Sequence, residues 1–129
     1  MRKEHPVTPH ILVIDDEEPV RVVLRQMLEK EGYEVEEAQD GAVGMNLLHD
    51  HLYDLIITDL FMPEKEGIET MMEVRKCFPQ VKIIAMSGGG RAGALDFLPM
   101  AESFGALRTL AKPFERKELL EAVRAVLVQ

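Results

Sequence analysis

Five polar side chains stand at the ends of short apolar runs, and their types suit one kind of chemistry. They are Asp15, Asp16, Asp59, Ser87 and Lys112. Three carboxylates that lie close together cannot all stay ionised cheaply unless a cation compensates them. Oxygen ligands without histidine or cysteine suit a hard ion, Mg²⁺ before Ca²⁺ or Mn²⁺. The lysine and the hydroxyl add donors for an anion, so the set predicts a site for a metal ion and a phosphate group.

The first two acids belong to a run of four, Asp15 to Glu18, which follows the apolar stretch Ile11–Ile14. Acids are common at helix starts, where the helix dipole favours negative charge. We assign that role to Glu17 and Glu18, which we expect to open a helix in solvent. Asp15 and Asp16 follow the apolar stretch directly, and we assign them to the cation.

The elements that must position these residues alternate between strands and helices. Apolar runs predict buried parallel strands at Ile11–Ile14, Leu55–Thr58 and Val81–Met86, with weaker candidates at Tyr33–Ala38 and Ala106–Leu110. Helical periodicity and end signals predict helices from Pro19 to about Gly32, from an Asp40 N-cap to about His51, over 66–78, over about 92–104 and over Glu115–Leu127. In the fourth helix Pro99 predicts a kink or a late start, and in the last we expect five buried residues: Leu119, Ala122, Val123, Val126 and Leu127.

Five such units imply a parallel sheet with helices on both faces, because right-handed crossovers leave few alternatives. Sites in such sheets form beyond the carboxyl ends of the strands. The five polar residues all follow or end predicted strands, so we expect them at one edge of the sheet.

Length and composition limit the class of protein. A chain of 129 residues with 47% hydrophobic residues suits one folded domain, which we place at 10–129 after a flexible leader at 1–9. A formal net charge of −8 argues against nucleic-acid binding, which needs a basic surface. Cys77 is the single cysteine, so no internal disulfide can form and we expect a cytoplasmic location. No apolar stretch is long enough to predict a membrane span or a signal peptide.

Four motifs make the resemblance to a known family specific. They are IDDE at 14–17, TDLFMPEKEG at 58–67, MSG at 86–88 and GALRTLAKPF at 105–114. Over roughly residues 9–128 the chain resembles a receiver domain of a two-component response regulator, of the chemotaxis-regulator kind. The resemblance implies a single doubly wound (βα)5 domain of the flavodoxin-like type, with a five-stranded parallel sheet of order 2-1-3-4-5.

The resemblance also implies a role for each site residue. Asp59 would accept a phosphoryl group from a histidine kinase or a phosphotransfer protein. Asp16, Asp59 and the backbone carbonyl of Phe61 would bind Mg²⁺ directly, and Asp15 would hold it through a water. Lys112 would pair with the phosphoryl group and the Ser87 hydroxyl would donate to it. Two features of backbone geometry follow as well: a cis Lys112–Pro113 bond, and a turn at Gly67 that shapes the loop after the acceptor.

The chain departs from the family at a position that matters for switching. Receivers usually carry Tyr or Phe three residues before the lysine, where this chain has Thr109. The usual movement of an aromatic ring therefore cannot run here. The glycine-rich segment between Ser87 and Lys112 is longer than in many members, and we expect it to move on phosphorylation. We expect a downstream protein to bind the face of the fourth helix, fifth strand and fifth helix, and the domain to be a monomer or a weak dimer.

Other functions fit the sequence less well. An aspartyl phosphatase needs a second aspartate two residues after its nucleophile, where Phe61 stands, and a flavodoxin would not place DDEEP beside the FMN phosphate. A phosphate-independent scaffold is a further alternative, against which the full set of site residues argues. Because the chain stops after the fifth predicted helix, it is either a free-standing receiver, which we favour, or a domain excised from a larger regulator or hybrid kinase.

Overall fold

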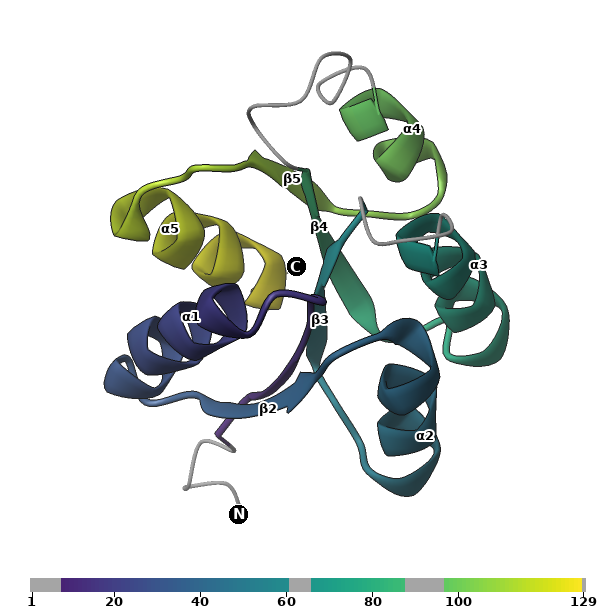
Figure 1. Cartoon of the computed structure of the whole chain (residues 1–129), viewed down its shortest axis with the longest axis horizontal. Helices are drawn as coiled ribbons and strands as arrows, with labels where there is room; N and C mark the ends of the chain where they lie inside the picture. Colours follow the sequence, from purple (N-terminus) through teal and green to yellow (C-terminus); the bar gives the residue numbers. More distant parts are fainter. Residues whose placement is uncertain (1–7, 61–65, 88–96, 129) are drawn as a thin grey trace.

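The chain folds into five alternating strands and helices (Figure 1). The structure, a computed structural model, describes residues 8–60, 66–87 and 97–128. The strands are β1 (His10–Ile14), β2 (Glu34–Ala38), β3 (Leu55–Asp59), β4 (Lys82–Ser87) and β5 (Arg108–Ala111). The helices are α1 (Glu18–Lys30), α2 (Gly41–Asp50), α3 (Glu66–Cys77), α4 (Phe97–Ser103) and α5 (Arg116–Leu127). Each predicted element is present, with bounds that differ from the prediction by a few residues.

The strands form one parallel sheet in the order β2-β1-β3-β4-β5. Helices α1 and α5 cover one face, and α2, α3 and α4 cover the other (Figure 1). This is the arrangement that right-handed crossovers dictate for five βα units, and it confirms the predicted doubly wound fold. Because all strands run in one direction, their carboxyl ends share one edge of the sheet.

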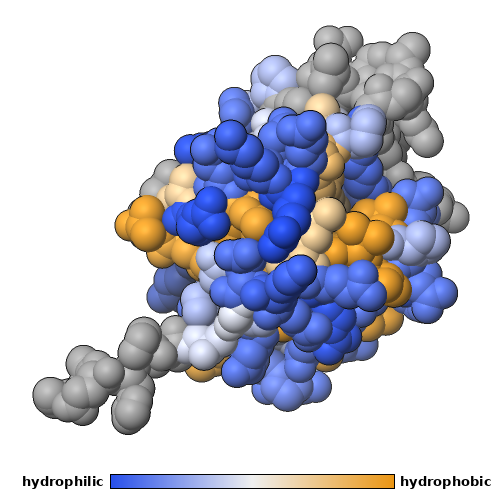
Figure 2. Space-filling view, turned by 90° about the vertical axis from the view of Figure 1, so that its left-hand side faces the viewer, coloured by the Kyte–Doolittle hydropathy of each residue, from blue (hydrophilic) through white to orange (hydrophobic). Residues whose placement is uncertain are grey.

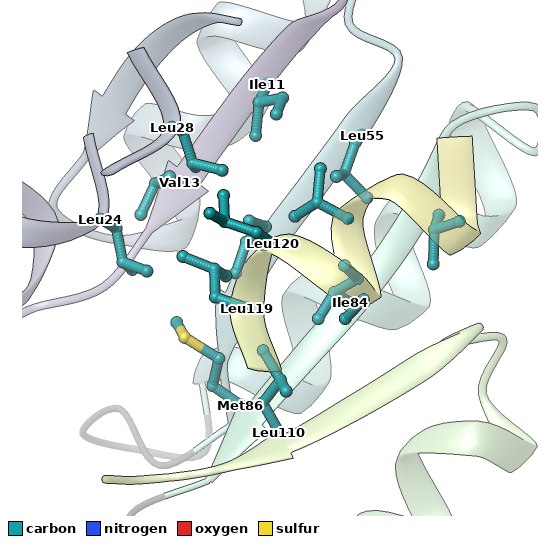
Figure 3. Close-up of a cluster of buried hydrophobic side chains, with 14 of the residues drawn as sticks. Ile11, Val13, Leu24, Leu28, Leu55, Ile84, Met86, Leu110, Leu119 and Leu120 are labelled. Atoms are coloured by element: carbon teal, nitrogen blue, oxygen red, sulfur yellow. The ribbon is translucent and has the colours of Figure 1, made fainter. Parts of the chain in front are cut away.

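Strand β1, which lies between β2 and β3, is buried on both faces of the sheet. Its odd-numbered residues Ile11 and Val13 belong to the core under α1 and α5, whereas Leu12 and Ile14 belong to the core on the other side. Figure 3 shows the first core, in which Leu119 of α5 lies among the side chains of the strands. A strand packed on both faces cannot shift without disturbing two cores, so its carboxyl end is held firmly.

The helix ends follow the predicted signals. Glu17 is the N-cap residue of α1, and the Asp40 carboxylate accepts a hydrogen bond from the Val43 backbone N–H at 2.8 Å. Pro99 lies in the first turn of the described part of the fourth helix, Phe97–Ser103, and residues 92–96, where we expected this helix to begin, lie outside the described residues. One detail of α5 was wrong: Leu127 is half-buried, and Leu120 is buried instead.

The outer surface of α1 and α5 is largely hydrophilic, with hydrophobic patches to either side of a hydrophilic band (Figure 2). Val22 and Val23 are exposed apolar residues of α1. Within the described part of the chain, no helix is both long and apolar enough to cross a membrane.

Gly67 has a different structural role from the one that the sequence suggested. We expected a turn there, but Gly67 is the second residue of α3. A Cβ atom on Gly67 would lie 2.2 Å from the carbonyl oxygen of Asp59 and 2.7 Å from Cα of Leu60. α3 therefore lies so close to the backbone at the end of β3 that only glycine, which has no side chain, fits at position 67.

This close approach predicts that Gly67→Ala lowers the free energy of unfolding by about 1–3 kcal/mol, because the new methyl group overlaps backbone rather than a movable side chain. Gly44→Ala is the matched control. Its Cβ would meet the Cδ1 atom of Ile14, at 2.6 Å, which is the far end of a flexible side chain. Alanine also favours the helix, so we expect Gly44→Ala to stay within about 1 kcal/mol of wild type. Urea denaturation of the three proteins checks this, and equal stabilities for Gly67→Ala and wild type would contradict it.

Candidate functional site

The carboxyl ends of four strands bring the five predicted residues to one edge of the sheet. Asp15 and Asp16 follow β1 directly, and Asp59 and Ser87 are the last residues of β3 and β4. Lys112 is the first residue after β5. The structure thus brings together all five side chains that the sequence singled out.

The Lys112 ammonium group bridges two of the acids. Its Nζ donates to Oδ2 of Asp15 at 2.8 Å and to Oδ2 of Asp59 at 2.9 Å. These ion pairs join residues that lie far apart in the chain and are well shielded, since the lysine side chain is only 15% exposed. The peptide bond between Lys112 and Pro113 is cis, as expected.

The three aspartates form a compact group of oxygen donors. One carboxylate oxygen from each of Asp15, Asp16 and Asp59 lies within 4.8 Å of the other two. Asp15 and Asp59 are buried, whereas Asp16 is exposed to solvent. A set of hard oxygen donors that is open to water on one side fits Mg²⁺, which keeps several waters when proteins bind it.

Burial sets the protonation behaviour of the site. The pKa of Asp15 is raised above its ordinary value because burial disfavours its charged form, and hydrogen bonds from Lys112 and from the Glu17 backbone only partly oppose this. Burial lowers the pKa of Lys112, but its hydrogen bonds to Asp15 and Asp59 outweigh that effect, so its pKa lies above the ordinary value. The ammonium group is therefore charged at neutral pH.

The Ser87 hydroxyl is buried at the end of β4, and the Lys112 backbone N–H donates to the Ser87 carbonyl oxygen at 2.7 Å. Among the described residues, none forms a hydrogen bond with the hydroxyl oxygen. A buried hydroxyl without a partner is costly. Its placement at the end of β4 fits a donor that is kept for an anion bound at the same edge of the sheet.

Sequence reasoning missed two contacts of the site. Glu17, which we assigned to solvent, is exposed but places Oε1 3.8 Å from the Lys112 ammonium nitrogen. Arg21 donates from Nη1 to the backbone carbonyl oxygen of Asp15 at 2.7 Å. The sequence places Arg21 in the first turns of α1, but no local pattern indicates that its side chain contacts residues 15–17, which we call the acidic turn.

Two predicted features fall on residues that lie outside the described ranges. They are the Phe61 carbonyl, which we expected as a metal ligand, and residues 88–96 of the glycine-rich segment. Thr109 is a half-buried residue of β5 that pairs with Ala85 of β4. A threonine therefore occupies the position of the usual aromatic residue.

A parallel α/β sheet that gathers three acids, a lysine and a hydroxyl at its carboxyl edge defines a class of cation-binding, phosphate-handling domains. Known proteins narrow this class. The model of the family described as the response regulator receiver domain matches residues 11–124. The chain belongs to this family.

Relatives and solved structures agree with this assignment. The chain is 30% identical over 117 residues to sporulation initiation phosphotransferase F of Bacillus subtilis (strain 168), with 91% of this chain and 92% of that protein covered. It is 36% identical to the transcriptional regulatory protein CpxR of Escherichia coli (strain K12), covering 91% of this chain but only 48% of CpxR. The chain thus spans about half the length of that regulator. A crystal structure of a response regulator receiver domain protein from Clostridium thermocellum superimposes with a TM-score of 0.84 at 30% identity, covering 93% of this chain and 94% of that one.

Membership of this family defines the general function. Receiver domains are signalling switches of two-component systems that phosphorylation controls, rather than enzymes that turn over a separate substrate. The predicted family and the predicted fold class are both confirmed.

The buried charge at Asp15 predicts a gain in stability when that charge is removed. Folding raises the pKa of Asp15 above its ordinary value of 3.8, so its ionised form destabilises the folded state at higher pH. We expect Asp15→Asn to raise the free energy of unfolding at neutral pH in metal-free buffer, because the amide carries no charge that burial penalises. The gain should shrink as the pH falls toward the ordinary carboxyl pKa. The Asp15 carboxyl group of the folded wild type is then protonated and neutral, like the amide of the variant.

Asp16→Asn is the control, because the Asp16 carboxylate is exposed and its removal should change the stability less. Thermal and urea unfolding with a chelator present measure both variants. A loss of stability in Asp15→Asn at neutral pH would contradict the prediction, since it would show that the pair with Lys112 outweighs the cost of burial.

Proposed function

We propose that Asp59 is the residue of this receiver that accepts the phosphoryl group, from a histidine kinase or a phosphotransfer protein. The observation that carries this proposal is the lysine bridge: Lys112 holds one oxygen of Asp59 and one of Asp15 at 2.9 and 2.8 Å. An ammonium group in this position lies beside the acceptor carboxylate and can pair with an anion that forms there.

The transfer step is a displacement at phosphorus. A carboxylate oxygen of Asp59 forms the new P–O bond while the P–N bond to the imidazole of the donor breaks. The imidazole keeps the electron pair and takes up a proton. Lys112 and the Ser87 hydroxyl are donors at this edge of the sheet that can bind the oxygens of the transferred group.

Mg²⁺ fits the acid cluster, with Asp16 and Asp59 as direct ligands, Asp15 as a ligand through a water, and the Phe61 carbonyl as a further ligand. When bound, the ion supplies positive charge that offsets the charge on the phosphoryl oxygens. This chain's part is to gather the three carboxylates within 4.8 Å of one another and to leave Asp16 open to water.

The output of the switch is proposed to be a protein contact at the face of α4, β5 and α5. Leu107, just before β5, is an exposed apolar residue, and α5 offers exposed charged residues such as Arg124. Exposed apolar groups beside charged ones suit a protein partner. The monomeric or weakly dimeric state and the cytoplasmic location stay predictions, as does the division into a leader at 1–9 and a receiver at 10–129.

Phosphorylation of Asp59 predicts a specific change in mass. Treated with acetyl phosphate and Mg²⁺, the wild-type chain should gain one phosphoryl group, while Asp59→Asn should gain none because an amide is too weak a nucleophile. Intact-mass spectrometry at neutral pH, soon after mixing, measures this gain.

Asp54→Asn is the matched control, since Asp54 is exposed and precedes the first residue of the same strand, at the opposite edge of the sheet. It should be phosphorylated like wild type. A chelator should abolish the gain in all proteins. No gain in wild type would shift the assignment to a phosphate-independent scaffold, and an equal gain in Asp59→Asn would show that another residue is the acceptor.

A further inference from the structure

Arg21 joins three parts of the fold next to the acidic turn. Its Nη1 donates to the carbonyl oxygen of Asp15 at 2.7 Å, and its Nε donates to Oε1 of Glu37 on β2 at 3.2 Å. The Arg21 side chain is 13% exposed and that of Glu37 is 21% exposed. The guanidinium group of Arg21 is largely buried and donates from two of its three nitrogens. Because its donors form a rigid fork, these hydrogen bonds fix it in one orientation.

The carbonyl oxygen of Asp15 belongs to the peptide bond that leads into Asp16. This bond is planar, so holding its oxygen sets the plane of the whole unit. Two further hydrogen bonds hold the same turn: the Asp15 N–H donates to the Ala38 carbonyl at 3.1 Å, and the Glu17 N–H donates to Oδ1 of Asp15 at 2.9 Å. Arg21 supplies the only side-chain contact to the carbonyl of this peptide within the described part of the chain.

The Asp16 side chain is exposed, and within the described residues nothing hydrogen-bonds its carboxylate. Its direction therefore depends on its backbone, which Arg21 orients. We propose that Arg21 is a positioning residue for the metal site, which holds the Asp15–Asp16 peptide so that the Asp16 carboxylate faces Asp59. This inference rests on the proposed Mg²⁺ site and adds a residue that does not itself touch the ion.

Arg25 serves as a control that distinguishes positioning of the metal site from a general effect on stability. It lies one turn further along α1 and binds the same glutamate, with its Nη1 3.1 Å from Oε2 of Glu37. Its Nε donates to Glu29 at 3.0 Å, and among the described residues it forms no hydrogen bond or ion pair with Asp15 or Asp16. Arg25 thus matches Arg21 in residue type, helix and partner, but lacks the contact with the Asp15 carbonyl.

The test compares the affinity for Mg²⁺ of wild type, Arg21→Met, Arg21→Lys and Arg25→Met by titration calorimetry without phosphodonor. Residues that orient metal ligands change affinity by about 10–100-fold when they are replaced. We expect both Arg21 variants to bind Mg²⁺ about tenfold more weakly than wild type. Lysine keeps the charge but cannot donate to the Asp15 carbonyl and to Glu37 with the same fork. Arg25→Met should bind Mg²⁺ as wild type does.

Unfolding curves and phosphorylation rates complete the design. All proteins are titrated well below their thermal midpoints, so that a loss of stability is not read as a loss of affinity. The rate with acetyl phosphate should return to near the wild-type value in Arg21→Lys at saturating Mg²⁺, because positioning alters the Mg²⁺ requirement rather than the acceptor.

Each outcome decides between distinct explanations. Wild-type affinity in Arg21→Lys would assign any effect of Arg21→Met to charge and would overturn the proposal. Equal weakening in Arg25→Met would overturn it too, because the whole network would then act through stability. A wild-type chain that binds no Mg²⁺ overturns the metal part of the proposed function together with this inference, whereas binding that is equal in wild type and both Arg21 variants overturns this inference alone.

Discussion

The ion pairs of Lys112 with Asp15 and Asp59 are the interaction on which the rest of the site depends. Two buried carboxylates at hydrogen-bond distance from one ammonium group would otherwise repel each other in a medium that screens charge poorly. The lysine compensates part of this charge, and the exposed Asp16 leaves one side of the cluster open to a cation. The positive charge that holds the two acids together can also pair with an anion bound at this edge of the sheet.

This arrangement requires a rigid frame, because a shift of one residue in any strand would separate the groups. Parallel pairing of β1 with β3 and of β3 with β4 sets Ile14 beside Thr58 and Asp59 beside Met86. The two apolar cores then hold the central strands from both faces. Gly67 allows α3 to pack directly against the backbone at the end of β3, so Asp59 lies on a strand end that packing holds in place.

A site of this kind lowers the stability of the domain that carries it. The raised pKa of Asp15 shows that its burial as an anion is unfavourable, and the Ser87 hydroxyl, which has no hydrogen-bond partner among the described residues, adds a second cost. Both costs fall on groups at the carboxyl edge of the sheet, where a cation and a phosphoryl group can offset them. Part of the packing energy of the domain therefore serves to keep unfavourable polar groups in place, and a ligand that binds at this edge would stabilise the fold.

The sequence by itself determined the five strands, the helices between them and the polar residues that lie at the carboxyl edge of the sheet. Apolar runs reveal buried strands, and polar residues at their ends must meet at one edge when the strands are parallel, so Asp15, Asp59 and Lys112 were predictable. Only the tertiary structure decided that Lys112 bridges two of the acids, that Gly67 serves close packing rather than a turn, and that Arg21 holds the carbonyl of Asp15. These facts depend on how closely a helix approaches the sheet and on which side chains then come within hydrogen-bond reach. Local patterns in a sequence record which face of an element is buried, but they carry no distance between elements.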